Sequence, residues 1–193
     1  SPSLSVQMNT AFDPSVAINV DANGSLYVHA CYIATDGPNA NAAAPNSGLY
    51  VHSGQFNPMT GAINWAPQPT EVAADPFSAI ALPSIMGNPG VNDPQYRFND
   101  RCQIITDPVR GDVYTAWIKD RGFYDRNTPL GLVNPPPSDI HFAYSNNFGA
   151  TFTNTTGTLN TVGLNDLGNM PIPVVDAIGD IYVSWLDYDV WTG

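Results

Sequence analysis

A pattern of an apolar run, an Asp, a Gly and a Tyr occurs three times in this chain and predicts three β-hairpins. The segments are residues 16–28 (VAINVDANGSLYV), 103–115 (QIITDPVRGDVYT) and 171–183 (PIPVVDAIGDIYV). Each is typical of a strand, a tight turn that contains Asp and Gly, and a second strand. Because one hairpin cannot bury its apolar face alone, the repetition predicts several copies of one unit that stack against each other.

A second recurring unit follows the first two hairpins. Residues 47–65 and 138–152 each contain a strand, a turn that begins at Ser and contains Gly, and a further strand. In the second copy, residues 140–144 (IHFAY) alternate in character as in a strand with two different faces. One full repeat is therefore expected to have four strands.

These repeats predict a single all-β domain. The first is expected at about 13–75, the second at about 99–163 and an incomplete third at 169–193, with 1–10 as the last strand of a preceding unit. Tandem four-stranded antiparallel units are the blades of a β-propeller, so a partial propeller is expected, with a β-sandwich as the alternative. Since propellers close with about four to eight blades, we expect a fragment whose remaining blades come from the rest of the native chain or from other chains.

The segment 145–152 (SNNFGATF) resembles the Asp-box, S-x-D-x-G-x-T-W, of sialidases and related propellers with bacterial neuraminidase repeats. Its Ser, Gly and Thr match, whereas Asn147 replaces the Asp and Phe152 the Trp. The segments 113–117 (VYTAW) and 181–185 (IYVSW) are also similar to that superfamily. The resemblance implies a propeller in which such boxes fold turns and do not catalyse. A similar box, stretched by an insertion, is suggested by Ser53, Gly61 and Trp65.

The catalytic residues of sialidases are not found in this chain. That family binds the substrate carboxylate with three Arg, and uses a Tyr/Glu pair as nucleophile and an Asp as acid/base. Residues 96–100 (YRFND) differ from the family's Arg-Ile-Pro segment, and Glu71, the only Glu, falls in a predicted loop. Asp100 and Asp120 are a carboxylate pair that could do acid and base work. The catalytic residues therefore stay unknown, and the chain is not assigned as an enzyme.

Charged side chains are scarce and are predicted to gather at one end of the fold. With 17 acidic and 6 basic residues the net charge is −11, which disfavours nucleic acid and anionic membranes as partners. The Asp/Gly turns are expected at one end, and long loops at 34–47, 66–98, 118–138 and 164–169 at the other. Five of the six cations fall at these loops. The candidate ligand-binding residues are Arg97, Asp100, Arg101, Lys119, Asp120, Arg121, Tyr124, Asp125 and Arg126.

This group of charges has two interpretations. Arg binds carboxylates through paired hydrogen bonds and aromatic rings stack on sugar faces, so one is a site for an acidic or hydroxyl-rich glycan. The other is a rim of ordinary solvated salt bridges. No cofactor is expected. The three histidines fall in different predicted strands without metal-ligand spacing and are interpreted as structural: His29, His52 and His141. The turn carboxylates Asp21, Asp107 and Asp176 are expected to hydrogen-bond the backbone of their own turns rather than Ca²⁺. Ca²⁺ at Asp187 and Asp189 is the remaining metal hypothesis.

Cys31 and Cys102 are candidate disulfide partners. Both are expected near the long-loop end, at similar height across the contact between two neighbouring repeats. A secreted location would allow them to oxidise. The alternative is that each is a small buried apolar residue.

Low Lys content, few charges and many Asn, Thr and Ser residues favour a secreted or cell-surface protein. The sequence has no transmembrane run, so membrane insertion is not expected. Two function classes follow. One is a ligand-binding or scaffold module of an extracellular β-propeller, with glycans as ligands. The other is part of a sialidase-like glycoside hydrolase.

Overall fold

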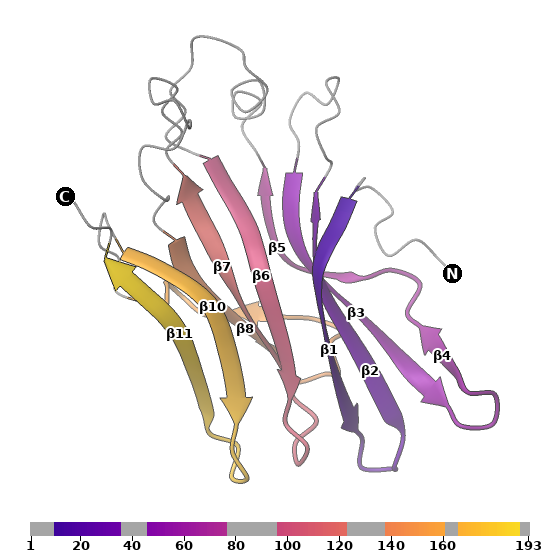
Figure 1. The fold of residues 1–193 in the computed structure, drawn as a ribbon. Helices are drawn as coiled ribbons and strands as arrows, with labels where there is room; N and C mark the ends of the chain where they lie inside the picture. Colours follow the sequence, from indigo (N-terminus) through magenta and orange to yellow (C-terminus); the bar gives the residue numbers. More distant parts are fainter. Residues whose placement is uncertain (1–9, 36–45, 77–95, 123–137, 161–165, 190–193) are drawn as a thin grey trace.

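The chain folds into β-strands in two sheets, and the described residues contain no helix, which confirms the predicted all-β class (Figure 1). The three predicted hairpins are present, and their turns lie at one end of the molecule. This computed structural model describes residues 10–35, 46–76, 96–122, 138–160 and 166–189.

The first sheet is an antiparallel meander whose fourth strand is divided in two. β4 pairs with the C-terminal part of β3, and β5 pairs with its N-terminal part. The prediction of a loop at 66–98 is therefore wrong at Glu71, which lies in β5 opposite Tyr50 because β3 is long enough to pair with both segments. The strands are β1 (Thr10–Val20), β2 (Leu26–Thr35), β3 (Asn46–Asn57), β4 (Ala62–Trp65) and β5 (Thr70–Pro76).

The second sheet repeats this arrangement and carries the third hairpin. A meander of three antiparallel strands is followed by a two-residue strand on β8. The third hairpin joins this meander through one parallel pair, Leu167 with Ser138. The strands are β6 (Tyr96–Thr106), β7 (Val113–Gly122), β8 (Ser138–Ser145), β9 (Thr153–Asn154), β10 (Asp166–Val175) and β11 (Ile181–Asp189).

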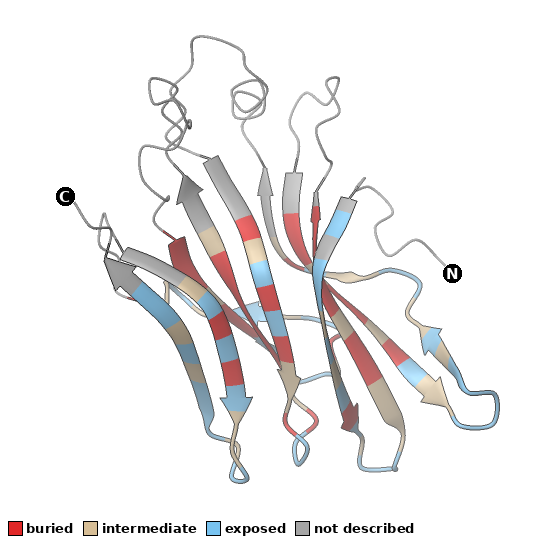
Figure 2. Cartoon of the chain, viewed as in Figure 1, coloured by how far each residue is buried: buried red, intermediate tan, exposed pale blue. Residues whose placement is uncertain are grey.

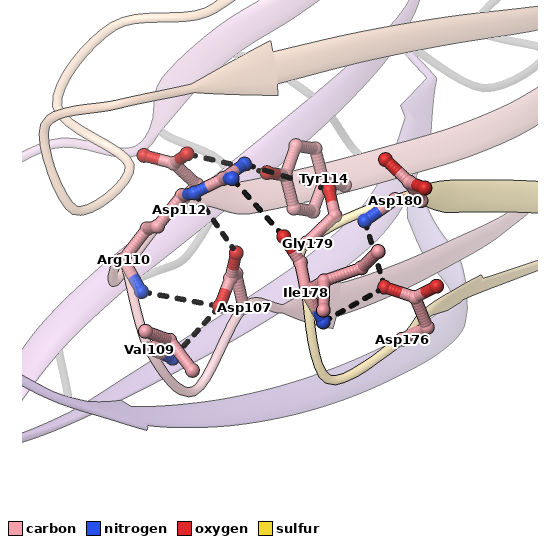
Figure 3. Close-up of polar contacts among 9 residues, drawn as sticks. All are labelled: Asp107, Val109, Arg110, Asp112, Tyr114, Asp176, Ile178, Gly179 and Asp180. Carbon is pink, nitrogen blue, oxygen red and sulfur yellow. Dashed lines mark hydrogen bonds and ion pairs between the residues drawn. The ribbon is translucent and has the colours of Figure 1, made fainter.

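The Asp at the start of each hairpin turn closes that turn. The Oδ1 atoms of Asp21, Asp107 and Asp176 each accept two backbone N–H bonds from their own turn, at 2.7 to 3.1 Å. This confirms the prediction that these carboxylates bond their own turn backbone. Figure 3 shows the second and third turns, where the Arg110 side chain also donates to the backbone oxygen of Ile178 at 3.1 Å.

The core lies between successive repeats. One buried cluster joins the first sheet, through Ile33 and Val51 among others, to Val113 and Trp117 of the second. A smaller cluster packs the opposite face of β7 and β8 against Val183 of β11. Figure 2 shows the resulting burial of the middle strands and the exposure of β11. Among the first strands of the three hairpins, β6 contacts both β1 and β10.

A turn of the second repeat, residues 145–152, packs onto the first repeat at the turn end. Gly149 has φ of +79°, and a Cβ there would lie 2.3 Å from Ser53 Oγ and 3.1 Å from His29 Nδ1. Gly157, with φ of +84°, has no such neighbour within 4 Å. Glycine is therefore required at 149 for contact between repeats as well as for backbone conformation.

We predict that Gly149→Ala destabilises the protein much more than Gly157→Ala. Both variants bear the left-handed backbone penalty of about 1–2 kcal/mol, but only Gly149→Ala adds a clash with Ser53 and a tight contact with the buried His29. Urea unfolding of the two variants measures the difference. Equal losses of unfolding free energy would show that the turn does not press on Ser53 and His29.

Candidate functional site

A β-bulge interrupts the first strand of each of the three hairpins, β1, β6 and β10, at an equivalent place. Asp13 in β1, Arg101 in β6 and Met170 in β10 have φ of 50°, 52° and 51°, and each lies where the pairing register shifts. Positive φ is uncommon in residues other than glycine. Bulges re-aim side chains and are frequent next to functional sites. The threefold recurrence therefore marks this part of the fold as a candidate site.

The three bulges surround one open hollow of about 630 Å³. Its polar side chains come from β1 and β6, while β10 contributes apolar ones. We call it the bulge hollow. It is lined by Asp13, Pro14, Asp100, Arg101, Cys102, Gln103, Met170, Pro171 and Ile172.

The electrostatics of the bulge hollow centre on Asp100. The pKa of Asp100 is raised to about 6, mainly by partial burial and to a smaller extent by a hydrogen bond with Asp13 and by the charge of Asp13. Arg101 opposes this rise, since its backbone N–H donates to Asp100 Oδ1 at 2.9 Å and its Nε lies 3.7 Å from Asp100 Oδ2. The site thus combines two interacting carboxyl groups and one partly exposed guanidinium.

The structure brings two of the nine predicted ligand-binding residues, Asp100 and Arg101, into this hollow. The prediction of a loop at 66–98 is wrong at Arg97, because β6 already begins at Tyr96. Lys119, Asp120 and Arg121 likewise lie in β7, not in a loop. The physical reason is that the β6–β7 ladder continues past the bulge.

Along that ladder Arg97 is directly opposite Arg121, and Asn99 is opposite Lys119. Two arginines are therefore cross-strand neighbours at the end of the hairpin farthest from its turn. The remaining predicted ligand-binding residues, Tyr124, Asp125 and Arg126, lie outside the described residues.

Sequence reasoning missed Asp13 and Met170 as residues of the site. Each is followed by a Pro, Pro14 or Pro171, inside a strand. Proline cannot donate to a sheet ladder and is confined to edges, strand starts or bulges. Pro14 and Pro171 were therefore the signal in the sequence that β1 and β10 contain bulges.

A Tyr/Glu pair is present but lies elsewhere. The Tyr50 hydroxyl donates to Glu71 Oε2 at 3.4 Å, between β3 and β5. Tyr50 alternates along β3 with Val51, which belongs to the core between the sheets. The pair is therefore on the other face of the first sheet, and neither β3 nor β5 lines the bulge hollow.

The predicted strand histidines take part in internal contacts. His29 Nδ1 lies 2.8 Å from Ser53 Oγ, and burial lowers the pKa of His29 to about 4. His52 Nε2 lies 2.7 Å from the Ala66 backbone oxygen, and His141 stacks on Trp117. These contacts agree with the interpretation of the three histidines as structural.

The described residues hold no group of three or more His, Cys, Asp or Glu side chains placed to bind a metal ion. Asp187, one of the two Ca²⁺ candidates, is exposed in β11, and the Asp189 side chain lies outside the described part. Within that part there is also no long apolar helix of the kind that crosses a bilayer.

Cys31 and Cys102 are free thiols buried in the same core cluster, across the contact between the first and second repeats. Cys102 Sγ donates to the Asp13 backbone oxygen at 3.2 Å, and Cys31 is opposite Ser15 in the β1–β2 ladder. Hydrogen bonding to Cys31, together with burial, raises the pKa of the Cys102 thiol. The two cysteines therefore lie on either side of the β1 bulge, close enough to interact.

We predict that Asp100→Asn becomes more stabilising, relative to the native chain, as pH rises from 4 to 7. The pKa of Asp100 is raised from 3.8 to about 6, so the folded state holds this proton more tightly than the unfolded state. The contribution of this group to stability is therefore complete below pH 4 and is lost as pH rises through 6. Melting temperatures at both pH values test this. Asp180→Asn, at an exposed turn carboxylate, is the control, and an equal pH response of both variants would contradict the prediction.

The disulfide stays a prediction and has its own test. Incubation with oxidised glutathione should remove both thiols, as two protons and two electrons pass to the reagent and an intramolecular S–S bond forms. Closing a loop of roughly 70 residues should stabilise the protein by ~4 kcal/mol in the chain-entropy model. Thiol counting in denaturant is the measurement, and two remaining thiols would rule the bond out.

Comparison with known proteins assigns no family. No family model matches the chain, and no curated protein matches it. The candidate site therefore rests on the geometry of the three bulges.

Proposed function

We propose that this chain is a segment of an extracellular β-propeller that binds a hydroxyl-rich glycan in the bulge hollow. The observation that carries the proposal is the recurrence of one bulge in three strands, which places Asp13, Asp100 and Arg101 around a single open hollow. Binding sites often combine an apolar lining with a few well-placed polar groups. Met170 and Pro171 supply apolar surface beside these polar side chains.

The blade arrangement is supported by how the repeats pack. Each of the first two repeats is a meander with a broken or short fourth strand, and apolar clusters lie between successive repeats. The segment 145–152 also folds as an Asp-box-like turn. Ser145 Oγ accepts from the Gly149 N–H at 2.9 Å, and Asn147 Oδ1 accepts from the Thr151 N–H at 2.9 Å, so the side chains of Ser145 and Asn147 close this turn.

The charge balance favours a hydroxyl-rich ligand over a carboxylate ligand. The guanidinium of Arg101 already lies beside Asp100, and Asp13 adds a second carboxyl group. A ligand carboxylate would therefore meet more negative than positive charge, whereas hydroxyl groups can donate to carboxylates and accept from the guanidinium. The net charge of −11 acts in the same direction and disfavours nucleic acid and anionic membranes as partners.

The proposed setting is secreted or at the cell surface, with further blades from the rest of the native chain or from other chains. The exposed face of β11 supports the presence of a further blade, because the apolar side chains of Tyr182 and Leu186 are 57% and 55% exposed there. Apolar side chains at such a density on one strand are typical of a surface that packs against another unit.

The alternative is part of a sialidase-like glycoside hydrolase. The hydrogen bond between Tyr50 and Glu71 is the observation that favours it, since a Tyr activated by Glu is the nucleophile of that family. The pair is disfavoured as a nucleophile because neither Tyr50 nor Glu71 lines the bulge hollow that contains Asp100 and Arg101. We therefore prefer the binding module.

We predict that Arg101→Asn and Asp100→Asn each weaken glycan binding by about tenfold or more, because a hydrogen bond to a charged group contributes ~1.5–3 kcal/mol. Asn is chosen at 101 because it tolerates positive φ. The measurement is calorimetric titration with a panel of neutral and sialylated oligosaccharides. Glu71→Gln is the control, expected to bind as the native chain does.

Two results would overturn the proposal. One is unchanged binding by the Arg101 and Asp100 variants. The other is turnover of a sialoside that Glu71→Gln abolishes, which would favour the hydrolase instead.

A further inference from the structure

A second hollow lies at the turn end of the molecule, where the Asp-box-like turn of the second repeat meets the first repeat. Its volume is about 430 Å³. We call it the turn-end hollow. Its aromatic and amide side chains are Tyr27, Trp65, Phe148, Gln55, Asn64 and Asn147.

The turn-end hollow differs from the bulge hollow in charge. None of the described residues that line it carries a formal charge at neutral pH, although the chain as a whole is strongly acidic. Three aromatic rings offer flat apolar surface, and the primary amides of Gln55 and Asn64 offer both donors and acceptors. The amide oxygen of Asn147 already accepts from Ser145 and Thr151 in its own turn. An ionic ligand would find no counter-charge here, whereas a neutral ligand with many hydroxyl groups matches both kinds of surface.

One wall is held in a strained conformation. Phe148 has φ of +56°, a conformation that is an outlier for a bulky residue. Its ring packs against Tyr27 with centroids 4.9 Å apart, and a Cβ at Gly111 would lie 2.9 Å from it. The ring is thus fixed between the two repeats. Strain of this kind persists where the surroundings over-determine it, and it clusters at ligand sites.

A buried polar chain fixes the wall behind the rings. The side-chain NH₂ of Asn19 donates to the Gly111 oxygen at 2.8 Å, so Asn19 Oδ1 faces His29 Nε2 at 3.1 Å. His29 Nε2 must then carry the ring hydrogen, and Nδ1 accepts from the Ser53 hydroxyl at 2.8 Å. Ser53, which lines the hollow, is therefore held in one orientation before any ligand arrives.

From this geometry we propose that the turn-end hollow is a binding site for a neutral saccharide. The C–H face of a sugar ring packs on Trp65 or Phe148, and Asn64 and Gln55 exchange hydrogen bonds with its hydroxyl groups. The preformed walls reduce the ordering cost of binding. This site is independent of the bulge hollow, because the two share no lining residue.

The test is saturation-transfer NMR and calorimetric titration with neutral gluco-, manno-, galacto- and chito-oligosaccharides. Asn64→Ala and Phe148→Asn should each weaken binding about tenfold, since they remove an amide or a ring. Asn64 is exposed on a short strand, so its variant should keep the native fold. Asn replaces Phe148 because it tolerates positive φ. Tyr182→Ala, at an exposed aromatic outside the hollow, is the matched control.

The bulge-hollow variant Arg101→Asn separates the two sites. The turn-end site is supported if Asn64→Ala weakens the binding of a neutral saccharide and Arg101→Asn and Tyr182→Ala do not. This result supports the turn-end site even if the proposed function of the bulge hollow is wrong. Binding that falls only with Arg101→Asn assigns the ligand to the bulge hollow and overturns this inference. No binding of any neutral oligosaccharide at about 10 mM overturns it as well.

Discussion

Burial of apolar strand faces between successive repeats is the interaction on which the rest of this structure depends. Each sheet has apolar side chains that it cannot cover by itself, and the buried set around Leu49 and Val51 meets Val113 and Trp117 of the next repeat. This packing fixes the height of one repeat against the next. The aligned repeats also form hydrogen bonds between β1 and β6, such as the one that Thr106 Oγ1 donates to the Ile18 backbone oxygen at 2.7 Å.

Both hollows are consequences of this alignment. The bulges form one hollow because β1, β6 and β10 come together with their bulges at similar height. The turn-end hollow forms because a turn of the second repeat reaches over the first, where Gly149 leaves room for Ser53. A change in repeat packing would therefore alter both hollows, even with every strand intact.

The two hollows differ in how they would recognise a ligand. In the bulge hollow, partial burial, together with the hydrogen bond and the charge of Asp13, raises the pKa of Asp100 to about 6, so its hydrogen-bonding character changes within the ordinary pH range. The turn-end hollow is lined by aromatic and amide side chains without formal charge, and burial lowers the pKa of His29 behind them to about 4. Ligand binding at the first site should therefore depend on pH and salt, and at the second on shape and hydroxyl pattern.

The sequence by itself determined the features that depend on neighbours a few residues apart. The three hairpins and their Asp-closed turns were predictable because Asp21, Asp107 and Asp176 bond backbone groups two to four residues away. The tertiary structure alone decided the sites. Asp13 and Asp100 meet only when two repeats stack, and β5 is a strand only because β3 offers it a partner. The physical reason is that pairing and stacking over long sequence separations leave no local pattern, except where a proline such as Pro14 or Pro171 records a bulge.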